Sequence, residues 1–210
     1  MGTAAHDITA AIAAERRELA ALFGDLDPER WEAPSLCAGW RVREVVAHMS
    51  MGFRHSTPAV LWELAKAGGS INRMADRLAR RDAAAHPDER LAAFLSEHAH
   101  HPWKPPVGGF ETALAHDVVH GLDVTVALGL DRRVPEDRLS VVLCTVGPRT
   151  SRFFGADLDG VRLHADDLDW TYGTGAPLHG TAQDLLLVAY GRRLPPGLLT
   201  GEVCHRFVAG

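Results

Sequence analysis

Two histidines spaced four residues apart are the residues of this sequence best placed to do chemistry. His116 and His120 lie in FETALAHDVVHGLDVTVALG, whose apolar residues predict a helix over 110–128 that is buried nearly all round. On a helix this spacing places both imidazoles on one face, about one turn apart, where they can chelate one metal ion. Burying them without partners would cost about 1–3 kcal/mol each, so we expect a metal, a charged partner or a hydrogen-bond network at the pair.

A third ligand is needed to decide between a metal site and two hydrogen-bonded core histidines. His48 is the best candidate, because in VREVVAHMS it lies mid-helix among apolar residues, although it too could be a hydrogen-bonded core histidine. Three neutral imidazoles around zinc leave one tetrahedral position for an exchangeable ligand. Such a metal lowers the pKa of a bound water or thiol and polarises a carbonyl group. Imidazoles suit zinc, which we expect first, although nickel, iron and copper also accept them.

Other residues are candidates for supporting roles. Asp123, three residues after His120, could accept the proton of a ligand histidine and so select its tautomer. His55, two turns after His48, could line the mouth of a pocket, with an ordinary surface position as the alternative. Cys37 could be a nucleophile, but nothing pairs with it in the sequence, and a small packed residue is the favoured interpretation.

A second group of histidines lies in EHAHHPW, where His98 and His101 are three residues apart. The group adjoins prolines and is expected in an exposed loop, since proline cannot occupy a helix interior. Histidines in exposed loops are more often solvated than bound to a metal. We therefore rank this group below the one formed by His48, His116 and His120.

The spacing of apolar residues predicts helices over most of the chain. We expect them over residues 7–24, from 40 or 41 to at least 53, over 59–82 with a break at Gly68–Gly69, and over 87–100, 110–128 and 136–154. Beyond residue 155, two β-prone runs, VRLHADD and DWTYG, and an apolar helix over 181–191 predict a small α/β part. The expected organisation is a helical bundle with the metal site over residues 1–154 and a small α/β domain over residues 155–210.

Composition excludes several classes of function. The 210 residues are 46% hydrophobic and 23% charged, as in globular proteins, and their formal net charge of -5 provides no basic field for nucleic acid. The N-terminal stretch interrupts its apolar residues with the charged run ERRE, which no secretory or membrane segment tolerates. Three cysteines without CxxC spacing are expected to be reduced. We expect a cytoplasmic protein with no nucleic-acid or membrane partner, either a monomer or a homodimer.

The sequence resembles the DinB-like metalloproteins, specifically their mycothiol-dependent maleylpyruvate isomerase branch. The matching segments are WEAPSLCAGWRVREVVAH, which ends at His48, and HDVVHGLD, which runs from His116 to Asp123. A third segment, DWTYGTG, is followed by LHGTAQDLLLVAYGR, which ends at Arg192. The segments occur in the same order as in the family and span nearly the whole chain.

The resemblance implies an up-and-down four-helix bundle of the DinB-like type, followed by a small α/β domain. It maps the metal ligands onto His48, His116 and His120. In this branch the metal activates the thiol of mycothiol for isomerisation or for transfer to a small electrophilic molecule. Arg192 would lie near the cleft between the domains and contact a substrate anion. The alternative is that Arg192 is an arginine at the C-terminal end of a helix, where the helix dipole favours a positive charge.

Two positions depart from the pattern of the isomerase branch. That branch has Glu-x3-His on the second ligand helix, whereas this chain has His116 at the first position. An imidazole in place of a carboxylate raises the charge of the site by one and makes its metal a stronger Lewis acid, which puts the specific isomerase reaction in question. Arg41 replaces the Thr or Ser that caps the preceding helix, with an expected local loss of about 1 kcal/mol.

The leading hypothesis is a metal-dependent isomerase or S-transferase that uses mycothiol as cosubstrate and acts on a small electrophile. A zinc-hydroxide hydrolase that needs no thiol is the first alternative. A non-catalytic protein that binds a metal or a small ligand under stress is the second, because the sequence lacks a general base such as the Glu of HExxH. Activity without any thiol would favour the first alternative, and tight binding without product the second.

Overall fold

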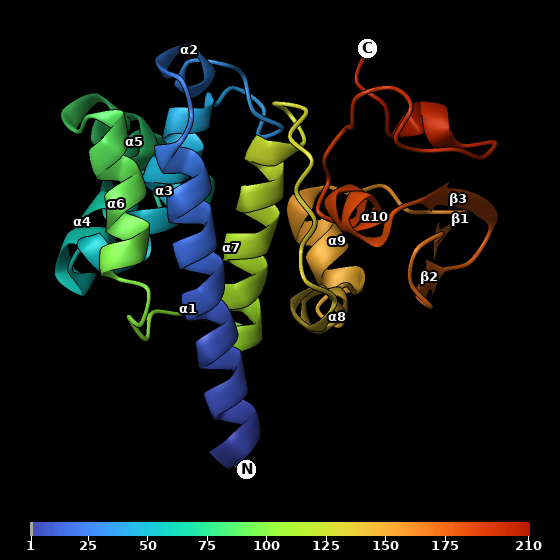
Figure 1. Cartoon of the computed structure of the whole chain (residues 1–210), viewed down its shortest axis with the longest axis horizontal. Coiled ribbons are helices and arrows are strands. Elements are labelled where there is room, and N and C mark those ends of the chain that lie inside the picture. The colour runs from blue at the N-terminus through green and yellow to red at the C-terminus, as the bar shows by residue number, and fades with distance from the viewer. Residues whose placement is uncertain (1) are drawn as a thin grey trace. The chain divides into compact units, whose positions relative to one another are not determined.

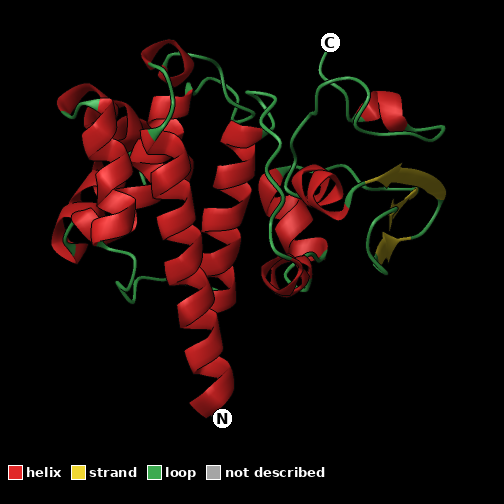
Figure 2. Ribbon diagram, viewed as in Figure 1, coloured by secondary structure: helices red, strands yellow, loops and turns green. Residues whose placement is uncertain are grey.

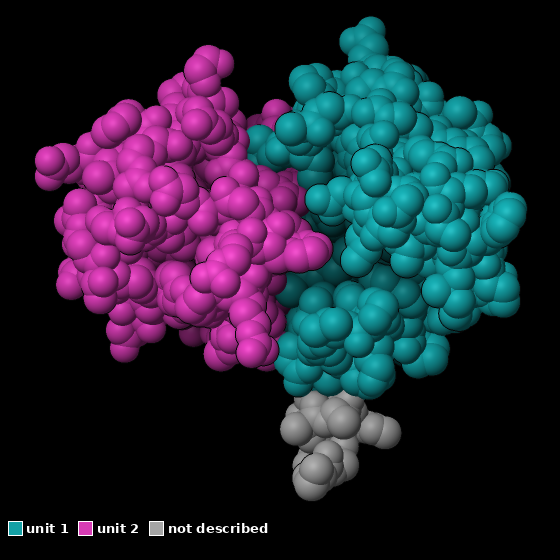
Figure 3. Space-filling model, turned by 180° about the vertical axis from the view of Figure 1, so that it is seen from behind, with its two compact units in different colours: residues 1–120 teal, residues 121–210 magenta. Residues whose placement is uncertain are grey.

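The fold is mainly helical. The computed structural model describes the backbone of residues 2–210 and the side chains of residues 8–210. The chain divides into two compact units, residues 1–120 and residues 121–210 (Figure 3). Both contain helices, and the second also contains a small sheet (Figure 2). The predicted fold class, mainly α with a small α/β part, is confirmed.

The first unit is a bundle of helices. They are α1 (Gly2–Gly24), α2 (Pro28–Trp31), α3 (Val42–Arg54), α4 (Thr57–Lys66), α5 (Ile71–Ala85), α6 (Asp88–Glu97) and the larger part of α7 (Gly109–Thr125) (Figure 1). α1 packs against α6, and α3 packs against both α5 and α6. The predicted break at Gly68–Gly69 separates α4 from α5, where both glycines adopt the left-handed conformation that ends a helix.

The start of α3 is stabilised by a residue that the sequence analysis overlooked. The carboxylate of Glu44 reaches back and accepts the backbone N–H of Arg41 at 2.8 Å, which satisfies one of the free donors at the helix start. It also accepts from Nε of Arg41. Burial opposes ionisation of this carboxyl, but the hydrogen bonds from Arg41 outweigh it and hold the pKa of Glu44 below its ordinary value. These bonds offset the loss that was expected from Arg41 at the cap position.

The core of this unit includes one broad face of α7. The hydrophobic residues of α7 before position 120 that are at most 2% exposed are Ala113, Leu114, Ala115, Val118 and Val119. His116 and His120 lie on the same helix but are only half-buried. The predicted buried helix is therefore present, with its two imidazoles at the border between core and solvent.

The predicted helix over 136–154 is wrong, because two shorter helices occupy this stretch. α8 (Glu136–Leu143) ends before Gly147, and α9 (Pro148–Phe154) begins with a proline. A proline cannot continue a preceding helix, but it is favourable in the first turn of a new one. Thr150 adds a bond from its Oγ1 to the carbonyl of Thr145 at 2.7 Å, which closes the turn between the two helices.

The sheet of the second unit has three strands in the order β2-β1-β3. β1 (Val161–Ala165) pairs antiparallel with β2 (Thr171–Gly173) and parallel with β3 (Ala176–Gly180). β1 and β2 match the two predicted β-prone runs, whereas β3 was not predicted. α10 (Ala182–Ala189), which was predicted, is buried along its length and packs against β1, and a short 3₁₀ helix, η1 (Cys204–Arg206), follows near the C-terminus.

The compact units do not coincide with the division expected from the sequence. The second unit begins at Gly121, and its contacts group α8 and α9 with α10. The expected boundary between residues 154 and 155 lies inside this unit. Separate folding of residues 1–154 and 155–210 stays a prediction. Within the described part of the chain, no helix is both long enough and apolar enough to cross a membrane.

Candidate metal centre

Three imidazoles from two helices meet in the first unit. His48 comes from α3, and His116 and His120 come from α7. The Nε2 atoms of His48 and His116 are 3.3 Å apart, and the centroids of the three rings are separated by 4.8 to 5.1 Å. One ring nitrogen of each lies within 4.8 Å of the others. The structure thus brings together the three histidines that the sequence analysis selected.

The spacing of these nitrogen atoms fits a divalent ion. Zinc binds imidazole nitrogen at about 2.0–2.1 Å, so two nitrogens on a tetrahedral zinc are about 3.3–3.4 Å apart. The Nε2 atoms of His48 and His116 already have this separation. One ring nitrogen of His120 lies within 4.8 Å of a ring nitrogen of each of the other two histidines. Three half-buried imidazoles at the border of a core are a donor set that zinc, nickel and copper accept.

A buried carboxylate selects the tautomer of His116. Asp117 Oδ1 lies 3.0 Å from Nδ1 of His116. Because a carboxylate oxygen accepts hydrogen bonds, Nδ1 carries the ring proton and its N–H donates a hydrogen bond to Asp117. The lone pair of His116 is then on Nε2, the nitrogen that faces His48. Asp117 is fully buried. A carboxylate behind a ligand histidine is the usual way to orient the ring and raise its basicity.

Arg16 holds Asp117 from the other side. Its Nε donates to Oδ2 of Asp117 at 2.8 Å, and both side chains are fully buried. Nη1 of Arg16 also donates to the backbone carbonyls of His98, Ala99 and His101 at 3.0 to 3.4 Å. The guanidinium of Arg16 on α1 therefore balances the charge of the carboxylate behind His116. It also hydrogen-bonds to the segment that follows α6 and holds it against the bundle.

Neither Arg16 nor Asp117 was predicted from the sequence. The predicted supporting carboxylate is Asp123, because this residue follows His120 by three positions. A signal for Asp117 was available, since it is a charged residue on a helix predicted to be buried nearly all round. No comparable signal identified Arg16, whose partner is 101 residues away.

Two tryptophans flank the histidines. The ring centroid of Trp40 is 5.0 Å from that of His48, and the ring centroid of Trp103 is 5.1 Å from that of His116. Nε1 of Trp40 donates to Asp76 at 2.7 Å, which holds its indole in place. Trp103 fits against α3 because residue 52 is a glycine: a Cβ there would be 2.1 Å from the indole. These apolar rings limit the access of water to the site.

Cys37 lies beside one of the three histidines. Its Sγ is 3.7 Å from Nδ1 of His120, and the cysteine is half-buried and not in a disulfide. The loop that carries it is held by Ser35, which accepts the N–H of Cys37 and donates to the carbonyl of Trp40. The favoured interpretation of Cys37 as a merely packed residue did not anticipate this neighbour. The proximity depends on the loop conformation and not on sequence spacing.

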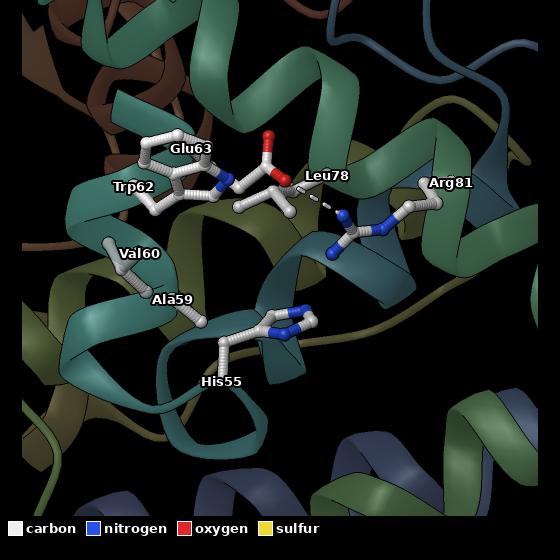
Figure 4. Close-up of a pocket in the computed structure, with 7 residues that line it drawn as sticks. All are labelled: His55, Ala59, Val60, Trp62, Glu63, Leu78 and Arg81. Atoms are coloured by element: carbon white, nitrogen blue, oxygen red, sulfur yellow. Dashed lines mark hydrogen bonds and ion pairs between the residues drawn. The ribbon is translucent and has the colours of Figure 1, made fainter. Parts of the chain in front are cut away.

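His55 lies apart from the three histidines. It follows the last residue of α3 and bonds to Oδ2 of Asp82 at 2.6 Å. It lines a pocket of about 80 Å³, in which Figure 4 shows Trp62 and the ion pair of Glu63 with Arg81. None of the three histidines lines this pocket. A catalytic or substrate-binding role for His55 stays a prediction, and its position gives no support to one.

Asp123 and Arg192, two further predicted residues, contact each other within the second unit. Nε and Nη2 of Arg192 each donate to one carboxylate oxygen of Asp123 at 2.8 Å, and Nη1 donates to the carbonyl of Tyr190 at 2.7 Å. Asp123 is fully buried, so the pair is a bidentate bond largely removed from solvent. A contact of Asp123 with a ligand histidine and a contact of Arg192 with a substrate anion stay predictions.

The second group of histidines is only partly solvated. His101 is exposed, as expected, and partial burial together with the charge of Arg16 lowers its pKa. His98 is half-buried and stacks on Phe53 with ring centroids 5.2 Å apart, and its Nδ1 faces the carbonyl of Phe94. The expectation of a solvated side chain is therefore wrong for His98, because the bonds of Arg16 draw this segment onto the bundle.

Comparison with known proteins gives one match to a family. Residues 12–102, which include His48, match the family model described as the mycothiol maleylpyruvate isomerase N-terminal domain. No curated protein matches the chain. Among solved structures, it is similar to the mycothiol-dependent maleylpyruvate isomerase and to a single-site mutant of that enzyme. Both are 15% identical, with TM-scores of 0.48 and 0.47, over 94% of this chain and 91% of the other. This match over residues 12–102 agrees with the resemblance to the mycothiol-dependent maleylpyruvate isomerase branch that the sequence showed.

Proposed function

We propose that His48, His116 and His120 hold one divalent metal ion, zinc first, and that the protein uses it to activate the thiol of mycothiol towards a small electrophile. The observation that carries the proposal is the facing pair of Nε2 atoms of His48 and His116 at 3.3 Å. Asp117 accepts a hydrogen bond from Nδ1–H of His116. The other ring nitrogen, Nε2, faces His48 and therefore has its lone pair available for a metal.

A bound divalent ion would supply Lewis acidity, which lowers the pKa of a thiol that reaches it. The residues of the chain prepare the site for this role. Arg16 pairs with Asp117 and holds this carboxylate in place behind His116, which favours the tautomer of His116 that binds a metal. Three imidazoles carry no charge, so the site keeps the full charge of the ion, which favours an anionic thiolate over a neutral thiol.

The surroundings of the histidines suit a reaction of a thiolate. Trp40 and Trp103 shield His48 and His116 from solvent. An apolar wall strengthens the electrostatic interactions within the site and leaves a thiolate poorly hydrated and reactive. The choice of mycothiol as the thiol rests on the match of residues 12–102 to the domain family that bears its name.

Two outcomes are open to a thiolate that attacks an electrophilic carbon. If that carbon carries a leaving group, the group departs with its bonding electron pair, the new carbon–sulfur bond persists, and the product is the thioether of an S-transfer. If the thiol adds to an activated double bond, the bond rotates and the thiol leaves with its electron pair, the product is an isomer and the thiol is regenerated. The unusual His116, in place of the carboxylate typical of the isomerase branch, is the reason to test both outcomes.

A hydrolase that needs no thiol is the second candidate. Three imidazoles form the ligand set that carbonic anhydrase uses to activate water with zinc. Activity that is unchanged after all thiols are removed from the assay would favour the hydrolase, whereas activity that depends on mycothiol would favour the leading proposal. A protein that binds a metal and the thiol but forms no product with any electrophile would be a binding protein.

Metal analysis of purified wild-type protein, combined with cobalt substitution, tests the proposal. The wild-type protein should contain a divalent ion that His120→Ala and His116→Gln lose, whereas His205→Gln, at an exposed position elsewhere, should keep it. Mycothiol should change the visible spectrum of the cobalt form, because a sulfur ligand enters the coordination shell. A His120→Ala protein that retains both the ion and full activity would contradict the proposal.

A further inference from the structure

A second cluster of metal-ligating side chains lies on the sheet of the second unit. It consists of His164 on β1, His179 on β3 and Asp166, which directly follows β1. One donor atom of each residue lies within 4.8 Å of the others. The cluster shares no residue with the three histidines of the bundle, and the proposed function does not use it.

The sheet itself places the three side chains together. His164 and His179 are direct partners in the parallel ladder, so their side chains project from the same face, and their ring centroids are 4.9 Å apart. Asp166 is two residues beyond His164 and therefore shares its face. The backbone N–H of Asp166 bonds to the carbonyl of Gly180 at 3.0 Å, which continues the pairing past the end of β1. The three residues thus stand on a hydrogen-bonded scaffold.

Their contacts leave donor atoms available for a cation. Asp166 Oδ1 lies 3.0 Å from Nδ1 of His179, within hydrogen-bond distance, so the carboxylate orients this ring while its second oxygen and Nε2 of His179 stay available for an ion. Nδ1 of His164 is covered by protein, yet it has no hydrogen-bond partner among the residues that the structure describes. Covered polar atoms of this kind normally have a partner, which a bound cation between the rings would supply.

We propose that His164, His179 and Asp166 form a second divalent metal site on the sheet. Two imidazoles and one carboxylate select late first-row ions such as Zn²⁺ and Cu²⁺ over Mg²⁺, which prefers oxygen ligands. The side chains of His179 and Asp166 are 35% and 55% exposed, so the ion loads directly from solution and keeps positions for water or another exchangeable ligand.

Equilibrium dialysis of the full chain, followed by metal analysis, tests the second site. The wild-type protein should bind one more Zn²⁺ and one more Cu²⁺ per chain than the variant with both His164→Gln and His179→Gln. Mg²⁺ should show no such difference. His205→Gln, which changes an exposed histidine of the same unit outside the cluster, should bind as many ions as the wild-type protein. Equal binding by the wild-type protein and the double variant would overturn the proposal.

Two further variants keep the test decisive. His120→Ala should lose the ion bound by the three histidines but keep the ion on the sheet. Metal analysis of this variant therefore tests the two sites separately. If circular dichroism shows that the double variant does not fold, Asp166→Asn, at an exposed position, takes its place. Loss of this carboxylate should weaken the binding of Zn²⁺ to the sheet by about 10-fold or more. Unchanged affinity in Asp166→Asn would then overturn the proposal.

Discussion

The carboxylate of Asp117 lies 3.0 Å from Nδ1 of His116, on the side of the ring opposite to His48. This one contact determines which nitrogen of His116 can bind a metal. Replacing Asp117 with Asn preserves the shape of the side chain but removes its charge and its ability to select the tautomer reliably. Asp117→Asn should weaken Zn²⁺ binding by the three histidines by about 10- to 100-fold.

Competition with a zinc-sensitive dye measures this change. The matched control is Asp131→Asn, because Asp131 is 96% exposed and lies in the other unit. The control should bind Zn²⁺ as the wild-type protein does. Equal affinities of Asp117→Asn and the wild-type protein would mean that Asp117 does not orient the ligand.

Arg16 and Asp117 should be strongly coupled in stability. Both are fully buried, so removing either one leaves an uncompensated charge in the core. We expect Arg16→Met to lower the free energy of unfolding by about 3–5 kcal/mol, measured by chemical denaturation. In a double-mutant cycle with Asp117→Leu, the combined loss should be smaller than the sum of the two single losses, because no isolated charge remains. Strictly additive losses would show that the pair is not coupled.

Gly52 should be intolerant of a side chain while Trp103 is present. Alanine is better than glycine in a helix by about 1 kcal/mol, but overpacking costs about 1–3 kcal/mol, and the added Cβ would lie 2.1 Å from the indole. Gly52→Ala should therefore lower the free energy of unfolding and change the near-ultraviolet circular dichroism of the tryptophans. In a Trp103→Ala background the same substitution should become stabilising by about 0.5–1 kcal/mol.

A control separates this clash from the general effect of alanine. Gly24, at the end of α1, has no heavy atom within 4 Å of the position of an added Cβ. Gly24→Ala should change the stability by only a few tenths of a kcal/mol either way, since the end of a helix gains less from alanine than its interior. If Gly52→Ala behaved like Gly24→Ala in the presence of Trp103, the packing of the indole on α3 would be refuted.

Asp82 should make the stability of the protein depend on acidic pH. Burial raises the pKa of its carboxyl, but the hydrogen bond from His55 and the charge of Arg54 outweigh this effect and lower the pKa below 3.8. A lowered pKa in the folded state adds stability that is present above the pKa of the unfolded state and is lost as the pH falls through the folded pKa. The wild-type protein should be more stable than Asp82→Asn at pH 7, and this advantage should shrink below about pH 4.

Denaturation of both proteins across this range of pH checks the prediction. The exposed Asp131→Asn variant should keep a constant difference from the wild-type protein, because its carboxyl is almost fully solvated in both states. An advantage of the wild-type protein over Asp82→Asn that is the same at pH 7 and at pH 3 would contradict the assignment.

The sequence alone determined the features that depend on local geometry. The spacing of His116 and His120 indicated that they share a helix face, because helical periodicity relates residues four apart wherever the helix lies. The apolar periodicity located most of the helices, and the segment around His48 indicated the family. The break between α8 and α9 could have been predicted as well, since Gly147 and Pro148 stand in the sequence.

Only the tertiary structure decided which distant residues meet. Asp117, a buried carboxylate beside His116, meets Arg16 on α1 because of how α1 and α7 pack, which the spacing of residues in the sequence does not reveal. Cys37 approaches His120 through a loop whose conformation no periodicity describes. His179 belongs to a strand that was not predicted, so its pairing with His164 could not be anticipated. Local spacing follows from backbone geometry, whereas contacts between elements depend on how their buried faces pack, which a single sequence does not specify.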